Sequence, residues 1–107
     1  MISSYILQGY IALPDNVECG ITNGLPSLTI VGLANKSVDE AKERLRAAIK
    51  ASGYSFPKQR ILINLAPADV PKNSASLDLA MAVAILHADK QIAIRKNASV
   101  ICIGELT

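Results

Sequence analysis

The sequence is poor in aromatic residues, with three tyrosines, one phenylalanine and no tryptophan among its 107 residues. Half of the residues are nevertheless apolar, so a core has to be built from isoleucine, leucine, valine and alanine. This composition excludes an intrinsically disordered chain. Because a chain of this length buries roughly two thirds of its unfolded surface, we expect a single domain, or part of one.

Cysteine and histidine are also scarce. Cys19 and Cys102 lie far apart in apolar runs, which favours two reduced thiols packed as small hydrophobic groups. No CxxC pair occurs and the single histidine is His87, so no metal site is predicted. His87 itself lies near the end of a predicted helix and is interpreted as a surface residue that suits the helix dipole.

The six glycines are scattered and form no phosphate-binding loop. A P-loop needs closely spaced glycines followed by Lys-Ser or Lys-Thr, so that backbone N–H groups can approach the phosphates. Neither that pattern nor GxGxxG occurs. We therefore expect no cofactor in this chain and no binding of ATP through a Walker motif.

The chain lacks a strong charge of either sign and lacks long hydrophobic runs. Its net charge of +2 neither requires nucleic acid as a partner nor excludes it. The apolar run at residues 77–86 contains Asp78 and is far shorter than the roughly 20 residues that span a bilayer. The first residues lack the basic and apolar regions of a signal peptide. We expect a soluble, cytoplasmic protein with no membrane partner.

The hydrophobic pattern predicts strands at residues 5–13, 17–22, 28–31, 61–65 and 100–103. Pro14, Asp15 and Asn16 are interpreted as a turn, and the first three strands as an antiparallel meander. The strand at 61–65 is apolar enough to be central. With two helices, the order β-β-β-α-β-α-β indicates an α+β, or mixed α/β, domain with a mixed sheet and its helices on one side.

Two helices are predicted, the first beginning at Ser37. The Ser37 hydroxyl and Glu40 match a capping box, and Gly53 provides the stop. The second helix, at about residues 76–87, is apolar on nearly every face and is expected to be buried, with Ser76 as its N-cap and Asp78 suiting its dipole. The apolar stripe of the first helix consists of Val38, Ala41, Leu45, Ala48 and Ile49.

A basic stripe follows the first helix, because Lys42, Arg46 and Lys50 recur at every fourth residue. We expect it to lie opposite the apolar stripe of the same helix. One interpretation is a solvated face. The other is contact with DNA phosphates, helped by Lys58 and Arg60.

Two smaller polar features remain. Glu40 and Arg44 form an expected i,i+4 pair beside the basic stripe. Asn64 and Asp69 flank the apolar residues 65–68, where they are either ligands or, as we expect, residues that stabilise the loop by hydrogen bonds.

Three segments resemble a known family: residues 23–33 (NGLPSLTIVGL), 41–49 (AKERLRAAI) and 63–72 (INLAPADVPK), supported by 52–54 and 77–80. They resemble the amino-terminal domain of the ComM/YifB family of magnesium-chelatase-like AAA+ proteins, across almost the whole chain. The resemblance implies a Lon-protease-type fold, shared with a ribosomal-protein domain and GHMP kinases. It also implies a domain that precedes an AAA+ ATPase module linked to DNA branch migration and natural transformation.

On this basis residues 1–107 are expected to be a non-catalytic accessory domain with an assembly, regulatory or DNA-contacting role, truncated before its carboxyl-terminal part and before the AAA+ module. ATP and Mg²⁺ are then expected only in that module. The expected partners are the AAA+ module itself, DNA, and other subunits of a hexamer formed by the full-length protein.

The Lon resemblance raises Ser76 as a candidate nucleophile. Residues 71–78 are similar to the Lon segment that carries the catalytic serine, and Ser76 falls on that serine. Activation would need a lysine that in Lon lies downstream of a segment resembling Gly104-Glu105, beyond this chain. Asp78 would also place a carboxylate near a developing oxyanion, which has the wrong sign for stabilising it.

Three functions are therefore compared. The leading hypothesis is the accessory domain, with no catalytic residue in this chain. The second is a serine-lysine peptidase-like domain that uses Ser76, which rests on fold analogy. The third is a magnesium chelatase subunit that acts on porphyrin, and the sequence contains no cluster of carboxylates that would support it.

Overall fold

The computed structural model describes residues 1–8, 10–66 and 75–106 of the chain. Apart from one short 3₁₀ helix, the described elements follow the predicted succession β-β-β-α-β-α-β. No described helix is both long and apolar enough to cross a membrane. The elements are β1 (Ile2–Gln8), β2 (Ile11–Thr22), β3 (Ser27–Val31), α1 (Asn35–Ala51), β4 (Arg60–Ala66), the 3₁₀ helix η1 (Ala75–Leu77), α2 (Asp78–Ala88) and β5 (Val100–Ile101).

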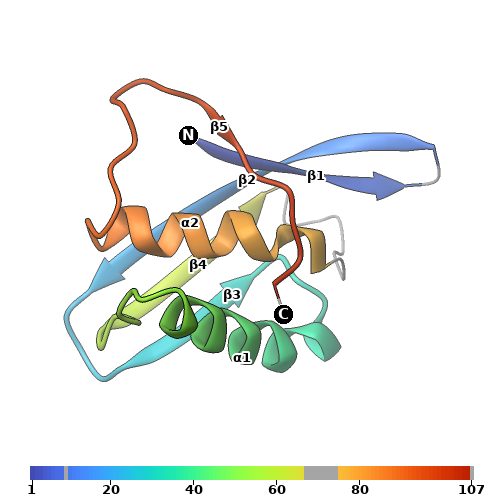
Figure 1. Ribbon diagram of the computed structural model, residues 1–107. Coiled ribbons are helices and arrows are strands. Elements are labelled where there is room, and N and C mark those ends of the chain that lie inside the picture. The colour runs from blue at the N-terminus through green and yellow to red at the C-terminus, as the bar shows by residue number, and fades with distance from the viewer. Residues whose placement is uncertain (9, 67–74, 107) are drawn as a thin grey trace.

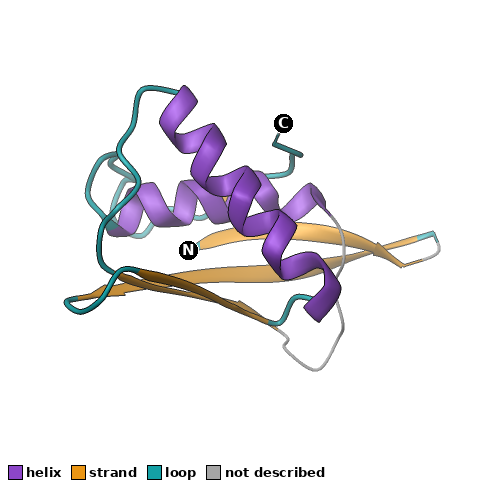
Figure 2. Cartoon of the chain, turned by 90° about the horizontal axis from the view of Figure 1, so that it is seen from below, coloured by secondary structure: helices purple, strands orange, loops and turns teal. Residues whose placement is uncertain are grey.

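The strands form one mixed sheet in the order β3-β4-β2-β1-β5. The β1–β2 and β2–β4 pairs are antiparallel, whereas β3–β4 and β1–β5 are parallel. Both α1 and α2 lie on the same face of this sheet (Figures 1 and 2). The predicted α+β class, with a mixed sheet and helices on one side, is confirmed.

The predicted meander of the first three strands is wrong, because β3 does not pair with β2. β4 lies between them, antiparallel to β2 and parallel to β3. A parallel pair needs a long crossover connection, and α1 supplies it between β3 and β4. The central position of β4 agrees with the prediction, since Ile61, Ile63 and Leu65 are each at most 2% exposed.

The predicted turn at Pro14, Asp15 and Asn16 is also wrong. These residues lie inside β2, where Pro14 pairs with Tyr5 of β1 and Asp15 pairs with Ser4. The chain reverses instead between Gln8 and Ile11, which face each other in the register. Among the described residues, the last β4 partner of β2 on this side is Ala66, which pairs with Asn16.

The core lies between the covered face of the sheet and the two helices. α1 contributes the predicted stripe, with Ala41, Leu45 and Ile49 buried and Val38 and Ala48 half-buried. The prediction that α2 is buried is also confirmed. Its buried residues are Asp78, Ala80, Met81, Ala82, Ala84, Ile85 and Leu86.

Neither helix begins with the predicted serine cap. α1 begins at Asn35, and the N-cap position is taken by Ala34, whose carbonyl accepts a 2.8 Å hydrogen bond from the Ser37 N–H. Ser37 therefore lies within the first turn, and the capping box is not formed. α2 is preceded by η1, which contains Ser76, so that Leu77 takes its N-cap position without a side-chain cap.

Both helices end with the same backbone motif. After α1, the Gly53 N–H donates to the Lys50 carbonyl and the Tyr54 N–H to the Ile49 carbonyl, with Gly53 at φ +87°. This is a Schellman motif, and it confirms Gly53 as the stop. After α2, the N–H groups of residues 90 and 91 donate to the carbonyls of residues 87 and 86 in the same way. There the left-handed position is occupied by Lys90, at φ 60°.

The last predicted strand is shorter than expected. β5 covers Val100–Ile101 and pairs in parallel with the start of β1, and the Cys102 N–H adds one further bond to the Ser3 carbonyl. The chain then leaves the sheet and runs over the start of α2. There the Gly104 N–H donates to the Ser76 carbonyl, and the Leu79 N–H donates to the Gly104 carbonyl.

Candidate functional site

Ser76 lies half-buried in η1, immediately before α2. Its carbonyl accepts a 3.0 Å hydrogen bond from Gly104, so the structure brings the Gly104-Glu105 segment against the serine segment. The preceding part of the Lon-like segment, residues 71–74, lies outside the described residues. Ser76 therefore lies where η1, the start of α2 and the Gly104-Glu105 segment meet.

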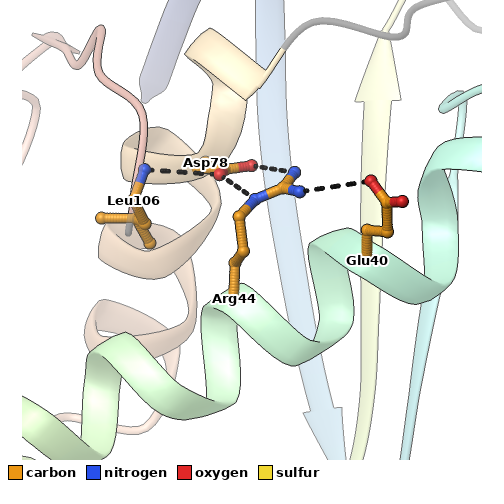
Figure 3. Close-up of polar contacts among 4 residues, drawn as sticks. All are labelled: Glu40, Arg44, Asp78 and Leu106. Carbon is orange, nitrogen blue, oxygen red and sulfur yellow. Dashed lines mark hydrogen bonds and ion pairs between the residues drawn. The ribbon is translucent and has the colours of Figure 1, made fainter.

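Asp78, two residues further on, is completely buried and forms an ion pair with Arg44 of α1. The Arg44 Nε and Nη2 atoms donate to the two carboxylate oxygens at 2.6 and 3.1 Å. The backbone N–H of Leu106 donates to the same carboxylate at 3.4 Å. As Figure 3 shows, this one side chain joins α1, the start of α2 and the carboxyl-terminal segment.

This ion pair changes the interpretation of Asp78. The residue does lie in the first turn of α2, as predicted, but its carboxylate is neutralised mainly by Arg44. The hydrogen bond to Asp78 in turn raises the pKa of the Arg44 guanidinium above its ordinary value. The expected pair of Arg44 with Glu40 is present at 3.9 Å, although the Glu40 side chain is 80% exposed. Electrostatic repulsion by Asp78 is therefore a weaker objection to chemistry at Ser76 than the sequence suggested.

The basic stripe of α1 lies beside the core stripe, whereas the sequence interpretation placed it opposite. Each cation directly follows a buried residue of α1, so it is rotated by about 100° around the helix from the core. Lys42 is half-buried, whereas Arg46 and Lys50 are exposed. The guanidinium of Arg46 lies 5.6 Å from the centre of the Phe56 ring, within cation–π distance.

The structure brings Lys58 close to this stripe. Lys58, Arg46, Phe56 and Ser27 line one shallow pocket of about 260 Å³, together with two prolines. Arg60 lies at the start of β4, where its side chain packs over Gly24 and leaves no space for a Cβ at that glycine. Of the two cations expected to assist the stripe, Lys58 therefore adjoins it directly. We refer to Lys42, Arg46, Lys50 and Lys58 as the α1 basic surface.

The remaining candidate residues lie apart from this surface. Asn64 is exposed on the sheet face opposite the helices, where it pairs in register with Glu18, and Asp69 lies outside the described residues. His87 is exposed in the last turn of α2, as predicted. Within the described ranges, no group of three His, Cys, Asp or Glu side chains is placed to hold a metal ion.

Both cysteines are free thiols, as expected. Cys19 lies on the covered face of β2, opposite Ile63 of β4. Burial raises the pKa of the Cys19 thiol to about 11, and it also raises the pKa of Cys102. The thiolate is the reactive form of cysteine, so neither residue has the environment of an activated nucleophile.

Comparisons with known proteins agree over most of the chain. A family model described as subunit ChlI of magnesium chelatase matches residues 17–107. The uncharacterized protein YifB of Salmonella typhimurium is 48% identical over 98 residues, which are 92% of this chain and 19% of that protein. YifB of Escherichia coli is 47% identical with the same coverage. The competence protein ComM of Haemophilus influenzae is 43% identical over 76 residues, which are 71% of this chain and 15% of ComM. The chain thus spans less than one fifth of the length of these relatives.

Proposed function

We propose that this chain, which belongs to the family of subunit ChlI of magnesium chelatase, is a non-catalytic accessory domain that contacts DNA. The matched segment is 19% of YifB and 15% of ComM, so these relatives are much longer than this chain. In the full-length protein this domain precedes an AAA+ ATPase module, which binds ATP and Mg²⁺ and assembles the hexamer. The competence relative favours a role in natural transformation, where the motor would drive DNA branch migration.

The α1 basic surface is the observation that carries the DNA contact. Three of its cations lie along one side of α1, and Lys58 extends it beyond the helix beside Arg46. Long cationic side chains on one surface suit the evenly spaced phosphates of a nucleic acid backbone, and they carry no base specificity. The contact is therefore expected to be weak, independent of sequence and sensitive to salt.

The proposal of a non-catalytic role is supported by the environments of the described residues that could take part in catalysis. Asp78 next to Ser76 is used in the ion pair with Arg44, and burial keeps the Cys19 thiol protonated at neutral pH. The scattered glycines provide no phosphate cradle of the Walker type. Binding and assembly, rather than bond making, are the activities that these residues support.

The experiment is a fluorescence anisotropy titration of short single-stranded and duplex DNA at low salt. The variant K42E/R46E/K50E should abolish binding, and log K of the wild-type chain should fall with log salt with a slope of about −3 for three to four phosphate contacts. The matched control is K90E/R95E/K96E, which reverses the same number of charges in the loop after α2. Circular dichroism should show that both variants remain folded.

Two outcomes would contradict the proposed surface. If the wild-type chain and the α1 variant bind DNA equally, the α1 basic surface is only a solvated face. If the control variant loses binding while the α1 variant keeps it, DNA is contacted by the loop. If K42E/R46E/K50E unfolds, the milder variant K42Q/R46Q/K50Q is used in its place.

A further inference from the structure

An open cavity of about 640 Å³ lies at the end of the molecule where α2 finishes. Its apolar part is formed by Ile2 of β1, Val17 of β2 and Ala84 of α2, which are all at most 8% exposed. The loop at residues 90–98 provides the rest of the wall. In Figure 1 this loop leaves α2, arches over and returns to β5 beside the amino terminus. The volume lies within the range of about 300–1,000 Å³ that is typical of small-molecule sites.

The charged residues of the cavity wall are cationic. Lys90, Arg95 and Lys96 line it, His87 adds an imidazole, and no Asp or Glu is among the described lining residues. Within the described part of the chain, none of the three cations forms an ion pair. The nearest carboxylate in sequence, Asp89, accepts a 2.8 Å hydrogen bond from the Gln91 side chain. The wall therefore presents positive charge beside an aliphatic surface.

The backbone of the same loop is left-handed at two residues. Lys90, at φ 60°, and Asn97, at φ 67°, are the two described non-glycine residues with positive φ, and both line the cavity. Gly53 occupies the same position after α1 that Lys90 occupies after α2. Glycine adopts this conformation without strain, so the lysine is kept at a cost in stability. A side chain kept at such a cost, with its position on a cavity wall, indicates a ligand.

We propose that this cavity binds a small organic phosphate with an aliphatic body. The phosphate lies at Lys90, Arg95 and Lys96, which supply charge-assisted hydrogen bonds. The aliphatic body packs against Ile2, Val17 and Ala84. A nucleobase fits less well, because no Phe, Tyr or Trp is among the described lining residues to offer a large stacking surface. No residue of α1 is among this lining, so the site is separate from the α1 basic surface.

Octyl phosphate is a suitable probe, used below its micellar concentration in a ¹H–¹⁵N titration of the 107-residue chain. We expect saturable shifts confined to residues 2, 17–19, 84–88 and 90–98. Octanol and inorganic phosphate should each bind at least about tenfold more weakly than octyl phosphate. Octanol lacks the phosphate group, and inorganic phosphate lacks the aliphatic body. Shifts spread over the whole surface, or equal affinity for inorganic phosphate, would overturn the proposal.

The left-handed residues provide matched variants. K90G should raise the melting temperature, because it relieves a left-handed lysine, whereas N97G should change it little, because asparagine tolerates this conformation. K90G should also weaken octyl phosphate by about tenfold, since it removes a charged hydrogen-bond donor, whereas K50Q, which removes a charge outside the cavity lining, should leave the affinity within about twofold. K90Q, which keeps the strained backbone and loses the charge, should weaken binding as K90G does. Unchanged affinity in K90G and K90Q together would overturn the role of Lys90 and the proposal with it.

Two further probes separate this proposal from other ligands. Oligodeoxythymidine that competes with octyl phosphate and shifts the same loop would show that the cavity serves nucleic acid, which overturns a small aliphatic ligand. Binding to phosphatidic acid vesicles without binding to octyl phosphate would show that the ligand is a membrane lipid. This result would also overturn the proposal of a small aliphatic ligand. Equal DNA binding by the wild-type chain, the α1 variant and the control variant K90E/R95E/K96E would contradict the DNA contact of α1 and leave this proposal unaffected, because no residue of α1 lines the cavity.

Discussion

Replacing Arg44 by methionine would leave the carboxylate of Asp78 buried without its cation. The Asp78 side chain is 1% exposed, and among the described residues the Leu106 N–H, at 3.4 Å, would be the remaining donor to it. Removing one partner from a buried ion pair costs about 3–5 kcal/mol, because the other charge stays desolvated. Since the Arg44 side chain is 28% exposed and water can follow it, we expect R44M to cost about 3 kcal/mol.

The opposite variant should be milder. In D78A the guanidinium of Arg44 keeps its access to solvent and its 3.9 Å contact with Glu40. The loss is then the two hydrogen bonds from Arg44, the 3.4 Å bond from the Leu106 N–H and a favourable charge at the start of α2, or about 1–2 kcal/mol. The double variant R44M/D78L, which removes both charges and keeps apolar volume, should recover about 2 kcal/mol relative to R44M alone.

Urea unfolding followed by far-UV circular dichroism measures these differences. The control is E40Q, which removes the exposed partner of Arg44 and should change the free energy of unfolding by less than about 0.5 kcal/mol. If R44M and D78A both cost less than about 1 kcal/mol, or if the double variant is no more stable than R44M, the pair is effectively solvated. The reasoning from its burial would then be wrong.

Three further predictions concern single residues. A fluorophosphonate probe should not label Ser76, and labelling that disappears in S76A would instead show an activated serine. Alkylation of Cys19 by iodoacetamide should be slow at pH 8 and should accelerate about tenfold per pH unit towards pH 10, because burial raises the pKa of Cys19 to about 11. An alkylation rate that is constant above pH 8 would contradict this prediction. G32A should cost about 2–3 kcal/mol in urea unfolding, because Gly32 has φ +99° and an added Cβ would press on the Leu65 backbone, whereas G20A, which meets nothing within 4 Å, should cost almost nothing.

The parts of the fold that sequence could predict are those encoded locally. Ala41, Leu45 and Ile49 recur at helical spacing, and they are the buried residues of α1. The apolar strand around Ile63 lies in the centre of the sheet, and Gly53 ends α1 through its left-handed conformation. In each case the pattern lies within one element and needs no distant partner.

The errors arise where distant segments decide the outcome. Pro14 and Asp15 are typical turn residues, but pairing with Tyr5 and Ser4 holds them in a long strand. The prediction of a meander is wrong because β4 lies between β2 and β3. β4 begins more than 30 residues after the end of β2, and a strand so distant in the chain cannot be placed from a local pattern.

The same limit applies to the site. Asp78 was interpreted as a helix-dipole residue, whereas its partner Arg44 lies 34 positions earlier in the chain. The α1 basic surface was recognised from its four-residue spacing. Arg46 directly follows the core residue Leu45, and this one-residue offset places the basic surface beside the core stripe. The sequence already contains this signal. The cavity at Lys90 was missed because its walls come from four separate segments.

The neighbouring positions of the first and last strands affect the order in which the sheet can form during synthesis. The Met1 ammonium donates to the Ala98 carbonyl at 2.9 Å, and the Val100 N–H donates to the Met1 carbonyl at the same distance. β1 can pair with β2 early, but the start of its other edge, at Ile2 and Ser3, gains its described partner β5 only when the segment around Val100 has left the ribosome. An unpaired strand edge is a template for another chain. On a polysome, pairing between nascent chains therefore competes with the pairing of this edge with β5.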